Sequence, residues 1–340
     1  MSKDQNHQTL PIDPNVDPYG YVGMVRRSDG SITRLQEPFV PVDTSNNHSL
    51  VVTKDIAINS SKNTWARIIL PRRLLHPPTT AKLPLVIYFH GGGFIVGTVD
   101  TPIFQGLYAS LASEIPAVVV SIEYRQAPEH RLPAAYEDCM EALHWIKNKP
   151  DEWLVNSADF SKCFLMGTSA GGNIVYHLGL KAASIWDNLK PLEIKGLILN
   201  QPFFGGTERT QSELKLVNDK MLPPIVSDIM WELGLPEGVD RDHEYSNPMV
   251  GIKSNPNLFD QVKLLGWKIL VTGCDGDPLI DRQTNLVRVL KELGVQILGS
   301  FTHGAYHGSV VIDPLKAKEF SIVVKEFVTP KASFVQDVND

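Results

Sequence analysis

The chain has 340 residues, of which 43% are hydrophobic, so it can bury a large core in one domain with insertions. Its formal net charge of −6, without a Lys/Arg-rich run, argues against nucleic acid as a partner. No apolar run reaches the roughly 18 residues that span a bilayer, and the polar residues 1–8 do not form a secretory signal, so we expect a cytoplasmic protein without a membrane partner.

The N-terminal segment, residues 1–50, differs in composition from the rest of the chain. Polar and proline-containing stretches surround one piece with apolar residues, 19–25, which is predicted to be a short helix lying over the body of the protein. We therefore interpret residues 1–50 as a capping segment, 51–330 as the main domain and 331–340 as a C-terminal tail.

Apolar strands and helical stretches alternate through the main domain. The predicted antiparallel edge strands are 51–57 and 65–70, and the predicted buried strands are 85–89, 117–122, 163–166, 194–199, 268–272 and 296–301. The predicted helices are 103–113, 134–148, 170–183, 282–293 and 314–327. This alternation indicates an α/β fold, with a mostly parallel central sheet flanked by helices on both faces. Residues 208–238 interrupt the rhythm with a helical run through Met230 and Trp231, which we interpret as a helical cap inserted over the strand ends.

A serine stands between small residues where a predicted strand meets a predicted helix. The sequence Gly-Thr-Ser-Ala-Gly at 167–171 matches G-x-S-x-G, the nucleophile elbow of α/β-hydrolases, in which a strained turn holds the serine hydroxyl clear of the sheet. That match alone is weak. A His-Gly-Gly-Gly loop at 90–93 precedes it, however, and Asp277 and His307 follow it. These are an oxyanion loop, nucleophile, acid and base in the order that this fold requires.

The chemistry assigns a role to each of these residues. Ser169 is the expected nucleophile, His307 the base that takes its proton, and Asp277 the acid that holds the imidazole in the useful tautomer. Backbone N–H groups would stabilise the oxyanion of the tetrahedral intermediate. The expected donors are Gly92, Gly93 and Ala170, with Gly91 shaping the loop.

The same set of motifs resembles those of the plant carboxylesterases in the hormone-sensitive-lipase group of α/β-hydrolases. The resemblance rests on His-Gly-Gly-Gly-Phe at 90–94, Tyr-Arg-Gln-Ala-Pro-Glu-His at 124–130, the segment 167–173, Asp-Pro-Leu at 277–279 and His307, and it extends from about residue 51 to 328. An N-terminal capping segment is also typical of those plant proteins. Gibberellin receptors belong to the same family but typically lack the catalytic histidine, so His307 favours an enzyme over a receptor.

Other residues compete for the same roles. His303 is a rival to His307, but His307 matches the position of the base in the family; Asp275 and Asp281 compete with Asp277, which directly precedes Pro-Leu as in the family. His90 has no companion with metal-ligand spacing, and we expect it to brace the oxyanion loop. The glycines of that loop lack the pattern of a phosphate or dinucleotide site, so we expect neither a cofactor nor a metal ion.

The chain departs from the family pattern at two positions. Thr168 stands where family members usually carry Asp or Glu, and Gln126 replaces the usual leucine in the stretch 124–130. A missing carboxylate beside the nucleophile changes the local charge and hydrogen bonding. Retuning for a particular metabolite is therefore an alternative to a broad esterase.

The resemblance implies a serine carboxylesterase that acts on a small or medium-sized ester through an acyl-enzyme. The alternatives are an esterase-derived enzyme of specialised plant metabolism, which hydrolyses an alkaloid methyl ester with decarboxylation or catalyses cyclisation or elimination, and a small-molecule receptor on an esterase scaffold. We expect the substrate pocket between the sheet ends and two covers, 19–25 and 208–238. The sequence does not tell which protein partners the chain has. The expected wall residues are Phe94, Phe204, Trp231 and Tyr306.

Overall fold

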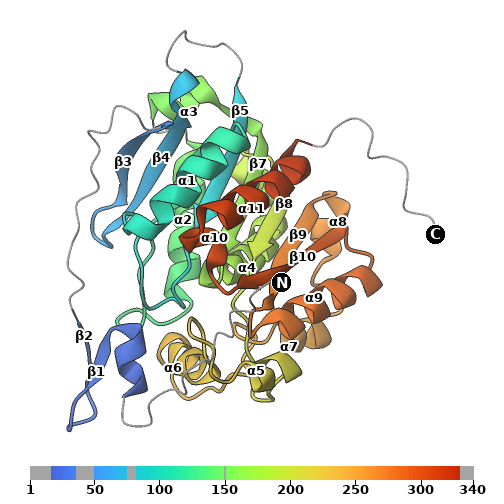
Figure 1. The fold of residues 1–340 in the computed structure, drawn as a ribbon. Helices are drawn as coiled ribbons and strands as arrows, with labels where there is room; N and C mark the ends of the chain where they lie inside the picture. The colour runs from blue at the N-terminus through green and yellow to red at the C-terminus, as the bar shows by residue number, and fades with distance from the viewer. Residues whose placement is uncertain (1–16, 36–49, 75–81, 149–150, 330–340) are drawn as a thin grey trace, which may run out of the picture.

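An eight-stranded sheet forms the centre of the molecule (Figure 1). Its order is β10-β9-β8-β7-β5-β6-β4-β3. The computed structural model describes residues 17–35, 50–74, 82–148 and 151–329; the predicted tail 331–340 lies outside these residues. The strands are β3 (Val51–Asn59), β4 (Thr64–Pro71), β5 (Leu83–Phe89), β6 (Val118–Ile122), β7 (Ala158–Thr168), β8 (Ile194–Asn200), β9 (Lys268–Gly276) and β10 (Ile297–Tyr306).

The sheet is mostly parallel, which confirms the predicted class of fold. Only the pairs β3 with β4 and β4 with β6 are antiparallel; β5, β6, β7, β8, β9 and β10 run parallel to their neighbours in that part of the sheet. Alternate residues of β5 belong to different cores: Leu85, Ile87 and Phe89 to one, and Val86 and Tyr88 to the other. A strand that is buried on both faces needs apolar residues at successive positions, which is the pattern in the sequence.

Helices cover both faces of the sheet. In Figure 1, α1 (Pro102–Glu114) and α11 (Pro314–Val328) lie in front of the strands, whereas α2 (Ala134–Lys147) and α4 (Ala170–Ser184) lie behind them. Several helices begin at a proline, which suits the first turn because no N–H is needed there. Among the described residues, every helix is too short or too polar to cross a bilayer. The remaining helices of the body are α3 (Glu152–Ser157), α9 (Ile280–Glu292), α10 (Ser309–Ile312), η2 (Arg72–Leu74) and η3 (Trp186–Leu189).

The strand β10 differs from its prediction as a buried strand. It forms the end of the sheet and pairs only with β9, so much of it faces outward: Leu298 is 54% exposed and Phe301 is 37% exposed. By contrast, β4 was predicted at an edge but lies between β6 and β3. Strand order depends on long-range pairing, which the local apolar pattern does not encode.

The chain between β8 and β9 leaves the sheet and forms four helices. These are α5 (Gln211–Lys215), α6 (Pro224–Gly234), α7 (Pro248–Ser254) and α8 (Asp260–Leu264). The predicted helical run through Met230 and Trp231 is α6. Both α5 and α6 fall within the predicted insertion 208–238, and the excursion continues beyond it.

The N-terminal segment packs on α6. The predicted helix at 19–25 is a 3-10 helix, η1 (Pro18–Val22), which ends where Gly23 adopts a φ of +63°. A hairpin that the sequence did not indicate follows, β1 (Met24–Arg26) paired with β2 (Ile32–Arg34). The hydroxyl of Tyr19 donates a hydrogen bond of 2.8 Å to Glu232 on α6. This contact fixes η1 against the insertion.

Candidate active site

Three predicted site residues form one hydrogen-bonded row at the carboxyl ends of the strands. Ser169 follows β7, Asp277 follows β9 and His307 follows β10. The Oγ of Ser169 lies 2.9 Å from Nε2 of His307, and Nδ1 of His307 lies 2.9 Å from Oδ2 of Asp277. Because an ionised carboxylate only accepts, the proton belongs on Nδ1, and Nε2 is then free to accept from the serine hydroxyl.

The turn that carries Ser169 requires the small residues around it. Ser169 has φ +56° and ψ −116°, a backbone conformation that L residues rarely adopt. A Cβ on Gly171 would lie 1.9 Å from the carbonyl oxygen of Phe89, and one on Gly167 would lie 2.2 Å from that of Gly171. Neither position tolerates a side chain, which explains the two glycines of the motif.

Asp277 is the carboxylate that the fold brings to His307. It is fully buried, and its Oδ1 accepts from the backbone N–H of Leu279 at 2.9 Å. Its Oδ2 also accepts from the side-chain amide of Gln283 at 2.9 Å, a supporting residue that the sequence analysis missed because no motif marks it. Of the rivals, Asp275 contacts the exposed His303, and Asp281 accepts from the backbone N–H of Ser212; both lie outside the row.

The predicted oxyanion loop runs beside Ser169. Gly92 and Gly93 have φ of +116° and +61°, and a Cβ on either would lie within about 2 Å of a neighbouring atom: 1.7 Å from the Val96 carbonyl oxygen for Gly92, and 2.1 Å from Sδ of Met230 for Gly93. Ala170 is the first residue of α4, where N–H groups have no partner within the helix. Within the described ranges, no group accepts a hydrogen bond from the N–H of Gly92, Gly93 or Ala170.

His90 supports this loop from within. Its Nδ1 lies 2.8 Å from the Gly91 carbonyl and therefore donates to it, and its own carbonyl accepts from the hydroxyl of Tyr124 at 2.9 Å. The two rings stack at 4.4 Å. Burial lowers the pKa of His90 to about 4, so the ring is neutral at neutral pH. Its Nε2 lies 3.7 Å from Glu123, whose pKa burial raises to about 8.

No metal site accompanies these residues in the described ranges, where no group of three or more His, Cys, Asp or Glu side chains could hold an ion.

Thr168 belongs to a row of buried polar side chains next to Ser169. Its Oγ1 accepts from the hydroxyl of Tyr88 at 2.9 Å and from the side-chain amide of Asn200 at 3.1 Å. Asn200 in turn accepts from the hydroxyl of Thr272 at 2.7 Å. The row therefore joins four neighbouring strands, β5, β7, β8 and β9, at the level of the site.

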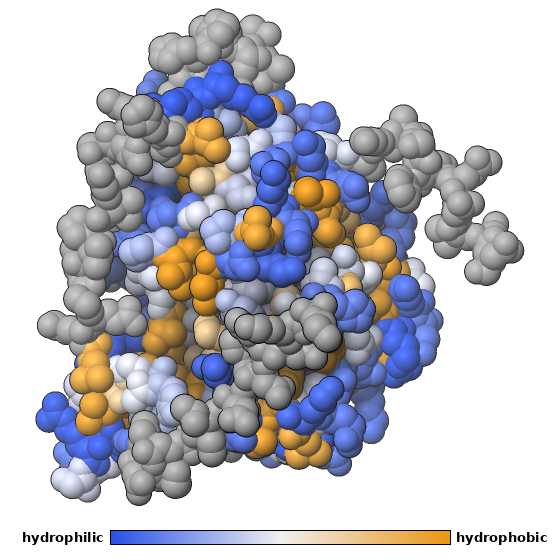
Figure 2. All heavy atoms as spheres, viewed as in Figure 1, coloured by the Kyte–Doolittle hydropathy of each residue, from blue (hydrophilic) through white to orange (hydrophobic). Residues whose placement is uncertain are grey.

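A cavity of about 380 Å³ opens above the row of Ser169 and His307. Both of them line it, together with Gly91, Gly92, Gly93 and Thr168. Its other walls are mainly apolar: Tyr21, Val96, Ile103, Phe104, Met221, Leu222, Val226, Met230, Val311 and Ile312. In Figure 2, apolar residues gather below α1 and α10 and above the N-terminal hairpin. Tyr21 comes from η1, and Val226 and Met230 come from α6, so both predicted covers contribute to the cavity.

The four predicted wall residues do not lie on this cavity. Phe94, Phe204 and Trp231 are each about 1% exposed and pack in the core; the rings of Phe94 and Trp231 lie 5.8 Å apart. Tyr306 is 38% exposed but is not among the lining residues. Aromatic residues contribute large areas to cores, and here Phe94 and Trp231 join the insertion to the body, while the cavity walls are mainly aliphatic. The sequence partly indicated the actual wall residues, because Tyr21 lies within the predicted cover 19–25 and Val311 lies shortly after the predicted base His307.

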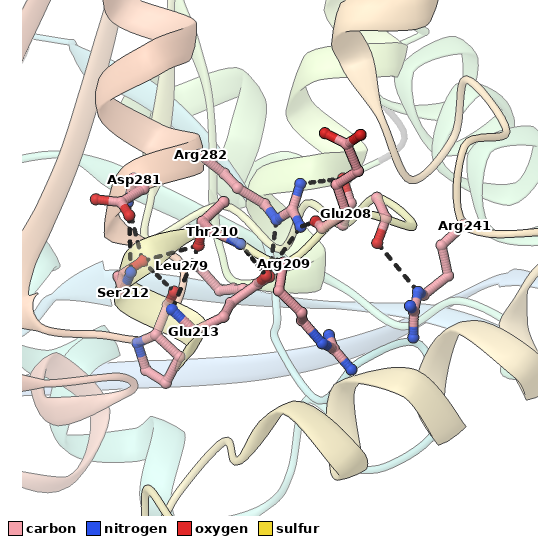
Figure 3. A network of polar contacts seen from close by, with 12 residues as sticks. Glu208, Arg209, Thr210, Ser212, Glu213, Arg241, Leu279, Asp281 and Arg282 are labelled. Atoms are coloured by element: carbon pink, nitrogen blue, oxygen red, sulfur yellow. Dashed lines mark hydrogen bonds and ion pairs between the residues drawn. The ribbon is translucent and has the colours of Figure 1, made fainter. Parts of the chain in front are cut away.

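A polar network anchors the insertion to the loop that carries Asp277 (Figure 3). Arg282, at the start of α9, forms a paired contact with Glu213 of α5, with N–O distances of 2.8 and 3.0 Å. Arg282 also donates to the carbonyls of Gly205 and Glu208. Ser212 donates its hydroxyl to the carbonyl of Pro278 at 2.7 Å. These contacts therefore join the insertion to the loop that carries Asp277.

Comparisons with known proteins agree with this fold. The family described by the alpha/beta hydrolase fold matches residues 86–311. Carboxylesterase 20 of Arabidopsis thaliana is 46% identical over 320 residues, which cover 93% of this chain and 97% of that protein. The 3-O-acetylpapaveroxine carboxylesterase CXE1 of Papaver somniferum is 42% identical over 324 residues, covering 92% and 97%. Among solved structures, an esterase of Pyrobaculum calidifontis is 27% identical with a TM-score of 0.65, covering 81% of this chain and 85% of that one.

The fold and these relatives define a carboxylic ester hydrolase. The chain belongs to the α/β-hydrolase fold family, and its similarity to the plant carboxylesterases extends over nearly its whole length.

Proposed function

We propose that this protein is a serine carboxylesterase in which Ser169 is the nucleophile, His307 the general base and Asp277 the acid. The observation that carries the proposal is the row of 2.9 Å contacts that joins these three side chains beside unpaired backbone N–H groups. The row supplies an activated hydroxyl, and the N–H groups supply the charge stabilisation that acyl transfer needs.

The proposed reaction uses these groups in turn. As Oγ of Ser169 attacks the ester carbonyl, Nε2 of His307 takes the hydroxyl proton and Asp277 stabilises the imidazolium. The oxyanion of the tetrahedral intermediate accepts hydrogen bonds from Gly92, Gly93 and Ala170, each worth about 3 kcal/mol. His307 then returns the proton to the leaving alcohol. Water attacks the acyl-enzyme by the same route, which releases the acid and restores Ser169.

The cavity supports a small or medium-sized, largely apolar ester as substrate. Its volume of about 380 Å³ is within the usual range for small-molecule sites, and its walls are mainly aliphatic. A second candidate is an ester of specialised plant metabolism, including a bulky alkaloid ester, because a Papaver somniferum relative at 42% identity is named for an acetylated substrate, 3-O-acetylpapaveroxine.

A cytoplasmic location is supported by the free thiols of Cys139, Cys163 and Cys274, which are typical of reducing compartments.

Turnover of p-nitrophenyl acetate and butyrate tests the proposal against a receptor on the same scaffold. We expect sustained release of nitrophenol by the wild type. Tight binding of esters without turnover would contradict the enzyme and favour the receptor. Acetate and methyl esters of bulky alkaloid-like alcohols and acids, assayed beside the nitrophenyl esters, distinguish a general esterase from a specialised one.

A further inference from the structure

The residue directly after β8, Gln201, contacts the loop of the base from both sides. Its side-chain N–H₂ donates to the carbonyl of Tyr306 at 3.1 Å, and its side-chain oxygen accepts from the N–H of Gly308 at 2.9 Å. These are the two backbone groups that flank His307. The same N–H₂ group lies 3.1 Å from the sulfur of Cys274. Gln201 is only 3% exposed, so these bonds are shielded from water.

The same short segment also holds the nucleophile. The N–H of Ser169 donates to the carbonyl of Asn200 at 2.9 Å, and the carbonyl of Ser169 accepts from the N–H of Phe203 at 2.9 Å. The N–H of Gln201 donates to the carbonyl of Thr272 on β9 at 2.8 Å, which ties the segment to the next strand. Residues 200–203 therefore contact the backbone of both Ser169 and the His307 loop.

The chemistry of the contact requires an amide. His307 lies between the end of β10 and the start of α10, where no neighbouring strand pairs with it. Tyr306 is the last residue of β10 that pairs with β9. The side chain of Gln201 carries an acceptor and a donor on a single planar group, and it bonds with them to the backbone on both sides of His307. Gln201 also has a φ of +44°, which is uncommon for a residue other than glycine and is typical of positions that surroundings hold firmly at functional sites.

We propose that Gln201 is a positioning residue, which fixes the distance between His307 and Ser169 by holding the backbone on both sides of the base. The proposal rests on the proposed esterase function, because it assigns Gln201 to the geometry of that reaction. Gln201 does not touch the reacting atoms. It acts through His307, so its loss should change the rate of the chemical step more than substrate binding.

The test compares Gln201→Met, which keeps the length of the side chain but loses the amide, with the wild type and with Gln296→Met as a matched control at an exposed position. We expect Gln201→Met to lower kcat for p-nitrophenyl butyrate about 10- to 100-fold, because a displaced catalytic group costs rates of this order. KM should stay within about twofold, because the cavity walls are unchanged. Gln296→Met should retain the wild-type kcat.

A second variant and a second readout keep the test independent of folding and turnover. Gln201→Glu keeps the acceptor for Gly308, but it can donate to the Tyr306 carbonyl only when protonated, so its kcat relative to the wild type should fall as pH rises. The low-field proton NMR signal of His307 Nδ1–H, assigned by its loss in His307→Gln, should weaken in both variants at neutral pH.

A folded Gln201→Met with wild-type kcat and an unchanged NMR signal would overturn the positioning role while leaving the esterase intact. Should Gln201→Met not fold, a Gln201→Glu variant with wild-type kcat at every pH would overturn it equally. Absence of ester turnover in the wild type would instead refute the proposed function, and the NMR signal would then decide the role of Gln201.

Discussion

At the scale of single residues, the fold holds the backbone of Ser169, the proposed nucleophile, in a strained conformation. Its positive φ is maintained by hydrogen bonds on both sides, from its N–H to Asn200 and from Phe203 to its carbonyl. Strain of this kind persists only where the surroundings fix the backbone. The hydroxyl is thereby held 2.9 Å from Nε2 of His307, so little reorganisation is needed when the proton moves.

Thr168→Asp should change the reaction profile more than the global stability. The hydroxyl of Thr168 accepts from Tyr88 and Asn200, and a carboxylate can accept from the same two donors. The added negative charge changes the local charge and hydrogen bonding beside Ser169, so kcat should change by different factors for different esters. Kinetics on a panel of esters measure this change in specificity.

Thr168→Asn is the matched control, because it has the shape of the aspartate without the charge. We expect its relative kcat values across the ester panel to match those of the wild type. Identical kinetics of all three proteins across the ester panel would show that position 168 has no influence on the reaction.

At the scale of elements, the short helix η1 should limit the size of the substrate. Tyr21 of η1 lines the cavity, and Tyr19 of the same helix is bonded to Glu232 on α6. Tyr21→Ala should raise KM for p-nitrophenyl hexanoate about tenfold, because the loss of one apolar wall contact costs roughly 1–3 kcal/mol. KM for the acetate should change less, since a short acyl group does not reach as far.

Deletion of residues 1–25 extends the same prediction to the whole segment. The folded truncation should raise KM for bulky esters more than for acetate. The control is Tyr19→Phe, which removes the hydrogen bond to Glu232 but keeps the apolar ring. A folded truncation with every KM unchanged would remove the N-terminal segment from the site.

The network in Figure 3 predicts a stability effect at the junction of α5 and α9. Glu213 is buried and Arg282 is half-buried, with side-chain exposures of 4% and 12%. Arg282→Met leaves the Glu213 carboxylate without its cation, and we expect the free energy of unfolding to fall by about 3–5 kcal/mol. Urea unfolding measures the loss. The double variant Arg282→Met/Glu213→Gln should recover part of it, and equal losses in the single and double variants would contradict this explanation.

At the scale of the whole molecule, the stability should depend on pH through Glu123. Burial raises the pKa of this carboxyl from an ordinary value of 4.5 to about 8. Between these two pH values the folded protein holds a proton that the unfolded chain has released. The contribution of Glu123 to stability is therefore fully present below pH 4.5 and is lost as pH rises towards 8.

Glu123→Gln tests this pH dependence, because glutamine keeps an acceptor for the N–H of Val99 and does not titrate. Urea unfolding at pH 5 and pH 8.5 should show the variant gaining stability relative to the wild type at the higher pH. A difference that is the same at both pH values would show that Glu123 is ionised in the folded protein.

Much of the fold could be predicted because its local patterns are strong. Strands buried on both faces are continuous apolar runs, as in β5 and β6, and amphipathic helices separate them. The order of strands in the sheet cannot be predicted from local sequence patterns. For this reason the predictions place β10 inside the sheet and β4 at its edge, and both differ from the structure. The hairpin of β1 and β2 was also missed, because its strands are three residues long and carry no clear alternation.

Some parts of the site can be predicted from local sequence motifs, whereas other parts depend on how distant elements pack. The row of Ser169, His307 and Asp277 could be predicted from motif order, since each residue must follow a strand of the same sheet. The cavity walls could not, because mostly aliphatic residues from separate elements form them, whereas the predicted aromatic residues Phe94, Phe204 and Trp231 pack in the core. Gln283 and Gln201 escaped notice because an isolated glutamine carries no signal of its partners.

The formation of an acyl-enzyme on Ser169 is the most direct test of the proposal that this serine is the nucleophile. Rapid mixing with p-nitrophenyl acetate should give a burst of about one nitrophenol per chain, followed by steady turnover. Mass spectrometry after labelling with a fluorophosphonate should place the adduct on Ser169. Ser169→Ala should abolish the burst and the adduct while keeping its fold, and His307→Ala should lower kcat about as severely, roughly 10⁶-fold, because the residues act as a unit. A Ser169→Ala protein that retains most of its turnover, or an adduct on another residue, would show that Ser169 is not the nucleophile.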